Sequence, residues 1–332
     1  MLANTKAWAV LGALWLVLGG DAHATQAGSS RLLVHQQRYT EAGREIDADL
    51  ARKPSDPGAL AARADLLLAR GGRDAPSAAQ VQAEHCVAAN PDNSLCAEAL
   101  GRALAAQARA GGLIAVVRHA HPTRDAFERA LRLDPSNYRA RVALLRFYLD
   151  TPFFLGGSGR RARELGSEAQ RTDPDLARLM RAMCAFDEGK LLDAEQVIMA
   201  ADLFDYVLVD DRQRDLLWAL AQTHFKAGRL ADSVRLFEEL GRRVPSSEQG
   251  AYGLALVARA QGRLDEAAMH LAKAVSIAPR PHVYRVLGDV HAARRDRPRA
   301  IAAYRAALAA IPPLDHSEQR QVTQQLASLQ GR

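Results

Sequence analysis

Residues 228–245 read GRLADSVRLFEELGRRVP, and residues 262–279 read GRLDEAAMHLAKAVSIAP. The second segment repeats the pattern of the first, and both begin with Gly-Arg-Leu and end with proline. Between those ends, apolar and small residues recur in the same register at a helical spacing. A glycine permits the turn before a helix, and a proline stops the helix that precedes it. Each segment therefore predicts one amphipathic helix of a repeated unit.

The same period extends along much of the chain. The number of residues from Gly228 to Gly262 equals the number from Pro57 to Pro91. The number from Pro279 to Pro312 is almost the same. Ala267 lies within the repeated segment where a small side chain lets two helices approach closely. A period of about 34 residues is typical of stacked helical hairpins.

The composition favours helices over sheets. The chain has 332 residues, of which 48% are hydrophobic and only 5% aromatic. Its core residues are mainly Ala and Leu, which are strong helix formers, and alternating runs of Val, Ile and Thr are scarce. The sequence predicts an all-α protein.

The charge pattern points to ordinary solvated helix faces. The formal net charge is +6, and a basic balance can indicate nucleic acid or an anionic membrane surface as partner. The Arg residues, however, are spread along the chain beside Asp and Glu. Because no dense basic run with interleaved aromatics occurs, we expect no nucleic-acid binding.

The C-terminal units resemble a known repeat family, the tetratricopeptide repeat. The residues that carry the resemblance are Tyr284, Leu287-Gly288, Ala300, Tyr304, Ala307 and Pro312, with a second copy in Leu100-Gly101, Phe127, Ala130 and Pro135. The resemblance covers roughly residues 30–312. It implies a right-handed α-α superhelix, a solenoid of antiparallel helix pairs, with a concave groove that binds peptides or protein segments.

The first 24 residues have the features of a secretory signal peptide. Lys6 is followed by the short apolar run 7–18, and Ala22-His23-Ala24 fits the small-residue cleavage pattern. The run is shorter than a membrane span requires. We expect cleavage after Ala24, export to a bacterial periplasm, and no stable membrane span in the mature form. The turn Pro152-x-x-x-Gly156-Gly157 also resembles a loop of some exported bacterial repeat proteins.

Departures from the period predict where the solenoid is modified. We expect the solenoid over residues 25–312, with insertions near 111–122, 151–159 and 202–214. Residues 313–332 predict a C-terminal capping helix, in which Asp315 and Glu318 form a capping pair at the start. A terminal unit of a repeat stack needs such a polar outer face.

Sequence motifs for chemistry are weak. The turn 156–159 lacks the Lys-Ser/Thr end of a P-loop, and His119 and His121 would point apart on a helix. No metalloprotease, nucleophile-elbow or Cys-x-x-Cys motif occurs. We therefore predict no catalytic residue, no metal, no cofactor and no enzyme activity.

The three cysteines differ in their expected roles. Cys86 and Cys96 flank the Pro91 turn, at helix ends that should be neighbours, and they are candidates for a disulfide. Cys184 lies among Leu179, Met180 and Met183 and is expected to be a buried apolar residue.

The register places a mixed aromatic and basic set on the outward face of the first helices. Aromatic and Arg side chains concentrate binding energy at interfaces. The predicted groove residues are Arg139, Arg146, Trp218, Gln222, Phe225, Lys226, Tyr252, Arg259, His282 and Arg285. The alternative for Trp218 and Phe225 is packing between repeats.

The leading functional hypothesis is a periplasmic scaffold or assembly factor that binds a segment of another cell-envelope protein in this groove. Two alternatives stay open. One is an enzyme or small-molecule binder that uses the inserted loops around His119 and Phe153-Phe154. The other is a self-associating structural envelope protein.

Overall fold

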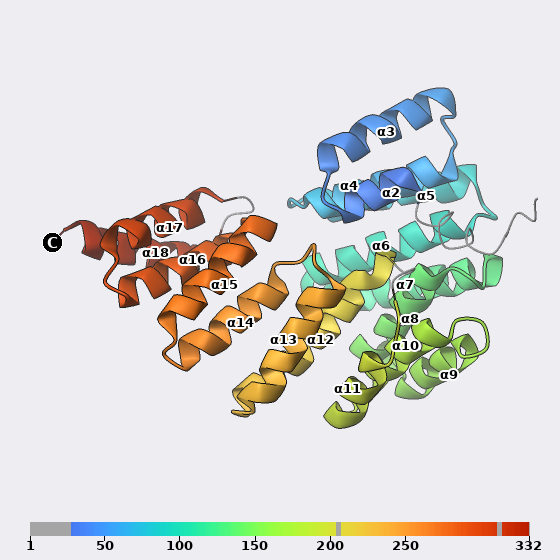
Figure 1. The fold of residues 1–332 in the computed structure, drawn as a ribbon. Helices are drawn as coiled ribbons and strands as arrows, with labels where there is room; N and C mark the ends of the chain where they lie inside the picture. The colour runs from blue at the N-terminus through green and yellow to red at the C-terminus, as the bar shows by residue number, and fades with distance from the viewer. Residues whose placement is uncertain (1–27, 204–206, 311–313, 332) are drawn as a thin grey trace, which may run out of the picture. The chain divides into compact units, whose positions relative to one another are not determined.

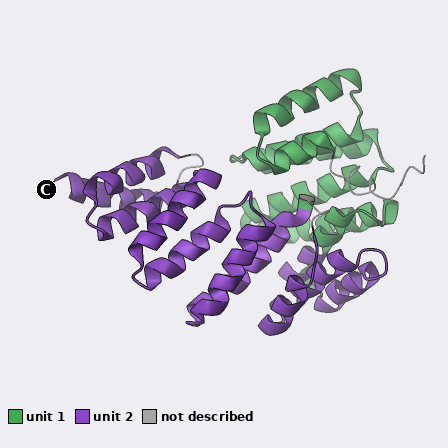
Figure 2. Ribbon diagram, viewed as in Figure 1, with its two compact units in different colours: residues 1–144, 151–156, 205–208 green, residues 145–150, 157–204, 209–332 purple. Residues whose placement is uncertain are grey.

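The computed structural model describes residues 28–203, 207–310 and 314–331. These residues form helices and connecting turns, and no strand occurs among them, so the predicted all-α class is confirmed. The predicted signal peptide, residues 1–24, lies outside the described residues. Figure 1 shows the helices in chain order, and Figure 2 colours the two compact units into which the chain divides. Unit 1 comprises residues 1–144, 151–156 and 205–208, and unit 2 comprises the rest.

Unit 1 contains three antiparallel helix pairs. They are α2 (Ser29–His35) with α3 (Tyr39–Arg52), α4 (Pro57–Arg70) with α5 (Ala75–Ala89), and α6 (Ser94–Ala110) with α7 (Gly112–Leu133). The short 3-10 helix η1 (Phe153–Leu155) packs against α7. The helix α8 (Tyr138–Asp150) begins in unit 1 and ends in unit 2.

Unit 2 continues the alternation. Its helices are α9 (Gly159–Ala169), α10 (Pro174–Asp187), α11 (Leu191–Met199), α12 (Asp210–Lys226), α13 (Leu230–Arg243), α14 (Gln249–Ala260), α15 (Leu264–Ile277), α16 (Pro281–Ala293), α17 (Arg297–Ala309) and α18 (His316–Gln330), with the 3-10 helix η2 (Val207–Val209) immediately before α12. The pairs α10–α11, α12–α13, α14–α15 and α16–α17 pack together. We call the even-numbered helices up to α16 the first helices, because each opens a pair.

The quoted segments form the second helices of two pairs. Residues 230–243 are α13 and residues 264–277 are α15. Gly228 and Gly262 precede them with φ angles of 74° and 75°, a left-handed conformation that glycine adopts without strain. Ala267 is fully buried in the core between α14, α15 and α16. The glycine and alanine positions of the repeat thus have the physical roles that the sequence indicates.

The extra residues near 111–122 lengthen a helix instead of forming a loop. The helix α7 has 22 residues and contains Pro122, which cannot donate a backbone hydrogen bond. Residues 112–121 therefore form additional turns before the regular second helix. His119 lies in these turns, so the inserted loop that the sequence suggested around it is a helix.

The other departures have different structures. In residues 151–159, η1 is followed by Gly156 at a φ of 101°, and the Ser158 hydroxyl accepts a hydrogen bond from the backbone of Arg161 at the start of α9. In residues 202–214, α12 already begins at Asp210. At the C-terminus, Asp315 accepts backbone hydrogen bonds from Ser317 and Glu318 and so caps α18.

Candidate partner-binding face

Three successive first helices of unit 2 bring their rings together. Trp218 of α12 stacks on Tyr252 of α14, with ring centroids 5.9 Å apart and an interplanar angle of 16°. Tyr252 in turn meets His282 of α16 edge to face at 5.0 Å. All three side chains are half-buried. We call Trp218, Tyr252 and His282 the aromatic ladder, and it crosses three repeats.

A glycine positions the base of this ladder. The ring of Phe237 on α13 lies 5.2 Å from the Trp218 ring and is fully buried. A Cβ atom at Gly253 would lie only 2.2 Å from the nearest carbon of that Phe237 ring. Because Gly253 has no side chain, the Phe237 ring packs against the α14 backbone. In this position it also contacts the Trp218 ring.

Charged residues lie beside the ladder on the same helices. The Asp289 carboxylate lies 3.7 Å from Arg259 and 3.7 Å from Arg285, and it accepts a 2.8 Å hydrogen bond from the Tyr304 hydroxyl. Arg285 also pairs with Glu318 of α18 at 3.5 Å. The Arg259 side chain is 41% exposed, so much of its guanidinium is available to a partner.

Burial sets the charge of the ladder rings. It lowers the pKa of His282 below its ordinary value, so this ring is neutral at neutral pH. Burial also raises the pKa of Tyr252, which stays protonated. The ladder therefore presents uncharged aromatic surface next to the two cationic side chains.

The other predicted groove residues of unit 2 are not part of the aromatic ladder. Gln222 and Phe225 are half-buried on α12, and Lys226 is exposed at its C-terminal end. Arg146 forms a 2.8 Å ion pair with Asp150 one turn along α8. The contacts of Trp218 with Phe237 and Tyr252 are those expected of packing between repeats, while its half-buried state leaves part of the indole accessible.

Arg139 has a different environment from the one expected of a groove residue. Its side chain is only 10% exposed and contacts Asp65 at 3.1 Å and Glu98 at 3.5 Å in unit 1. These two carboxylates are themselves buried and need compensating cations. Arg139 is therefore part of an internal ion cluster, which the sequence did not predict.

That cluster connects the first helices of unit 1. Arg31 of α2, which is 2% exposed, pairs with Asp65 of α4 at 3.2 Å and with Glu98 of α6 at 2.5 Å. Arg102 approaches Asp65 at 2.8 Å. Burial raises the pKa of Glu98 to about 7 although Arg31 acts against the shift. We call Arg31, Asp65, Glu98, Arg102 and Arg139 the ion cluster.

The sequence carries a signal for this cluster that composition alone does not reveal. Arg31, Asp65 and Glu98 follow one another at successive steps of the repeat period. Residues one repeat period apart fall on neighbouring first helices, and the stacking of these helices brings the three side chains together.

A buried histidine joins three helices of unit 2. The Nε2 atom of His224 lies 2.9 Å from Glu195, and Arg229 donates to its Nδ1 atom at 2.9 Å. Arg235 also pairs with Glu195. The group acts as a bridge between α11, α12 and α13.

A cleft of about 580 Å³ lies between α9, α10 and α11. Its lining includes Arg163, Arg178, Arg181, Cys184, Glu188 and Lys190. Burial raises the pKa of the Cys184 thiol to about 11, so this thiol is not a ready nucleophile. None of the lining residues belongs to residues 111–122 or 151–159, where the enzyme alternative would place its site.

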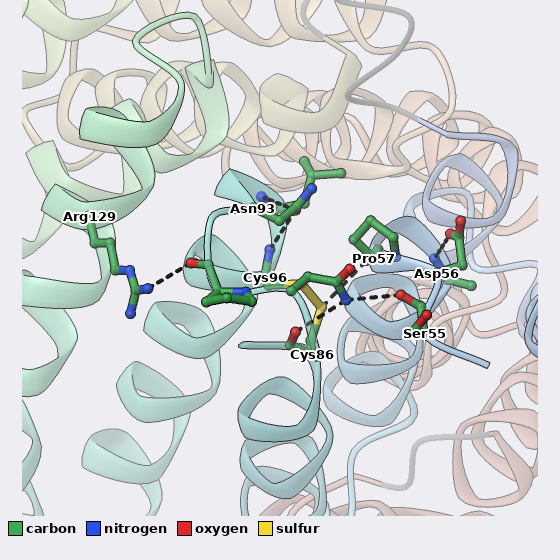
Figure 3. The surroundings of a disulfide bond; sticks show 11 residues. Ser55, Asp56, Pro57, Cys86, Asn93, Cys96 and Arg129 are labelled. Carbon is green, nitrogen blue, oxygen red and sulfur yellow. Dashed lines mark hydrogen bonds between the residues drawn. A yellow bond between two sulfur atoms is a disulfide. The ribbon is translucent and has the colours of Figure 1, made fainter. Parts of the chain in front are cut away.

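Cys86 and Cys96 are joined by a disulfide in this structure (Figure 3). Their Cα atoms are 5.2 Å apart, and both residues are fully buried. The bond connects the end of α5 to the first turn of α6, where Asn93 caps α6 through its side chain. It therefore fixes the connection between two successive helix pairs of unit 1.

The described residues contain neither a metal-binding cluster nor a membrane-spanning helix. No group of three or more His, Cys, Asp or Glu side chains there has an arrangement that could hold a metal ion. Among the helices of residues 28–331 that the structure describes, none combines the length and apolar character needed to cross a membrane.

The fold and the ladder are those of a helical-repeat protein, and comparisons with known proteins specify the repeat. Residues 219–281 match the family model described as "Tetratricopeptide repeat". No curated protein sequence matches the chain significantly. The match supports the tetratricopeptide resemblance for residues 219–281.

Solved structures share this fold. The yeast Tom70 structure aligns with 89% of this chain at a TM-score of 0.61 and 13% identity, and this chain spans 59% of the Tom70 chain. A human IFIT1 dimer with m7Gppp-AAAA aligns with 92% of this chain and 72% of its own at a TM-score of 0.50 and 15% identity. At these identities the likeness concerns the fold alone.

Proposed function

We propose that this protein is a periplasmic scaffold or assembly factor that binds an extended or helical segment of another cell-envelope protein. The tetratricopeptide fold indicates a protein-protein interaction role. The segment binds on the first-helix face of unit 2, over the aromatic ladder and the exposed side of Arg259. It carries acidic and apolar residues.

The ladder is the observation that carries the proposal. Half-buried rings on three successive repeats offer a large contact area whose geometry is fixed before binding, so little conformational entropy is lost. The adjacent Arg259 can fork onto a carboxylate of the bound segment. Aromatic and Arg side chains in this combination are enriched among residues that dominate binding energy.

The proposed location rests on the N-terminal sequence and on the cysteine pair. The signal-peptide pattern of residues 1–24 directs export, and a disulfide such as Cys86–Cys96 persists in an oxidising compartment. Fractionation of cells and N-terminal sequencing of the exported protein test this part, with Thr25 as the expected first residue. A protein that keeps Met1 in the cytoplasmic fraction would overturn it.

The chain offers a direct optical test of the binding face. Its three tryptophans are Trp8, Trp15 and Trp218, so a form that begins at Thr25 contains Trp218 alone. We expect partner segments captured from an envelope extract to shift the fluorescence of that single tryptophan and to shield it from a soluble quencher. An unchanged spectrum and unchanged quenching with bound partner would place binding elsewhere.

A paired substitution separates binding from folding. Trp218→Ala with Arg259→Glu should abolish crosslinks formed by a photoreactive group at Gln222, while far-UV circular dichroism stays unchanged. The matched control changes an exposed apolar residue and an exposed Arg of unit 2 away from the ladder, Leu192→Ala with Arg171→Glu, and should retain the crosslinks. If the ladder variant is folded and retains every crosslinked partner, the proposed face is not the site.

A further inference from the structure

The two segments that interrupt the repeat in unit 1 carry most of its exposed large apolar side chains. In residues 112–121, Leu113, Ile114 and Val117 are 86%, 77% and 58% exposed. In η1, Phe153 and Phe154 are 86% and 66% exposed. Elsewhere in the described residues, the large hydrophobic side chains with comparable exposure are Val81, Leu192 and Met269. Exposed apolar groups are therefore concentrated where the chain departs from its period.

The additional turns of α7 are amphipathic. One side of the helix carries Leu113, Ile114 and Val117, because Ile114 and Val117 follow Leu113 by one and four residues. Ala115, Val116 and His119 are half-buried and lie on the other side of these turns. The exposed side thus begins apolar.

The same side becomes basic in the next turn. Arg118 and His121 are exposed there, and Arg118 has no ion-pair partner among the residues that the structure describes. No Asp or Glu occurs between Glu98 and Asp125. An apolar turn followed by an uncompensated cation makes this surface complementary to an anionic one.

The second segment shares these properties. Phe153 and Phe154 meet edge to face, with ring centroids 5.6 Å apart. No acidic residue occurs between Asp150 and Glu164. Because η1 packs against α7 in the same unit, the two segments form neighbouring parts of one structural body.

We propose that Leu113, Ile114, Val117, Phe153 and Phe154 form a peripheral docking surface for an anionic lipid bilayer. We call these five residues the insertion surface. The apolar side chains enter the boundary between headgroups and acyl chains, as the apolar face of an interfacial helix does. Arg118 contacts lipid phosphates, since anionic headgroups attract basic residues next to an apolar face.

Exposure and charge together favour a bilayer over a protein partner. Protein interfaces of this chemistry usually concentrate their apolar groups in a packed patch that matches a partner's shape. Here the side chains project far into solvent from a helix end and a short turn, and a fluid bilayer accommodates such projections without a complementary shape. The surface lies in unit 1 and the aromatic ladder in unit 2, so the two proposals can be tested separately.

The test uses vesicle sedimentation with the form that begins at Thr25, which retains every described helix. We expect this protein to sediment with vesicles of phosphatidylglycerol and phosphatidylcholine in equal amounts and to remain in solution with phosphatidylcholine alone. Added salt should weaken the binding, because it screens the contribution of Arg118 and other basic groups. Failure of the wild-type protein to sediment with the anionic vesicles would overturn the proposal.

Substitutions then assign the binding to the insertion surface. Leu113→Ser, Ile114→Ser, Phe153→Ser and Phe154→Ser in one chain should weaken vesicle binding by at least about tenfold, because each removes apolar area from the bilayer. The matched control, Leu192→Ser with Met269→Ser, changes exposed apolar residues of unit 2 and should bind as the wild type does. Both variants should keep the wild-type circular dichroism spectrum.

Two outcomes would refute the assignment. Equal vesicle binding by the fourfold variant and the wild type would show that other residues hold the bilayer. Protein crosslinks from a photoreactive group at Val117, without any vesicle binding by the wild type, would show that the insertion surface docks a protein.

Discussion

Replacing Arg31 by Met tests whether the ion cluster holds the first helices of unit 1 together. Arg31 is 2% exposed and bridges Asp65 and Glu98, which lie on the next two first helices. Methionine fills a similar volume without charge, so the substitution removes the bridge and leaves little empty space. Both carboxylates stay buried, with Arg102 and Arg139 as their remaining partners.

We expect Arg31→Met to lower the free energy of unfolding at neutral pH by about 3–5 kcal/mol, the usual cost when one member of a buried ion pair is removed. The wild-type protein already has a pH dependence from this cluster. Because burial raises the pKa of Glu98 to about 7, the folded state holds this proton up to a higher pH than the unfolded chain does. Stability from Glu98 is therefore full below its ordinary pKa of 4.5 and falls as the pH rises towards 7.

Loss of Arg31 raises the pKa of the buried carboxyls further, because a stabilising cation is gone. The deficit of the variant should thus be largest at about pH 7 and should shrink towards about pH 3, where both carboxyls are mostly protonated in both states. Urea unfolding followed by circular dichroism at a series of pH values measures this deficit. The control is Arg38→Met, since Arg38 pairs with Glu41 across an exposed helix end and should leave the unfolding midpoint unchanged. An Arg31→Met midpoint equal to the wild type, or a deficit that does not vary with pH, would refute the reasoning.

Two further predictions concern packing and the disulfide. Gly253→Ala should lower the free energy of unfolding by about 1–3 kcal/mol, because its methyl group would collide with the Phe237 ring beneath Trp218; a thermal midpoint equal to the wild type would show that the ring moves aside freely. Thiol counting on the unfolded, non-reduced protein should find one free thiol, because Cys86 and Cys96 are paired. Three free thiols would contradict the pairing, and reduction should cost about 2–3 kcal/mol of stability if the bond closes only this short loop.

The fold was predictable because the packing of each repeat requires particular residue types at fixed positions. Glycine at the turn, alanine at close helix contacts and proline after the second helix each have one strong physical reason to recur. The inserted segment 112–121 was harder. The departure from the repeat period indicated only that residues are inserted there, and Pro122 removes only one hydrogen bond from a long helix.

The candidate site was predictable in part. Repeat register placed Trp218 and Tyr252 on the same face of successive first helices, one repeat period apart, and the structure brings their rings into contact. The repeat register could not show whether the Trp218 ring faces solvent or packs on Phe237. The packing depends on the space beside Gly253, which the register does not reveal. The repeat register also failed to predict the charged surroundings of Arg139. Its surroundings depend on which residues the stacking places opposite it, and Asp65 lies 74 residues away in sequence.

The first helices make different contacts in the two units, and this difference explains why the binding face is proposed in unit 2. In unit 1 the first helices carry Arg31, Asp65 and Glu98 at about one repeat spacing, and Arg31 pairs with both carboxylates inside the fold. A buried network of this kind gives its parts little freedom to change partners, because each separated charge would be left desolvated. In unit 2 uncharged rings connect the corresponding helices, and rings can contact each other on one face and a ligand on the other. The first helices of unit 1 thus use their polar groups for internal contacts, whereas those of unit 2 keep an aromatic surface that a partner segment can cover.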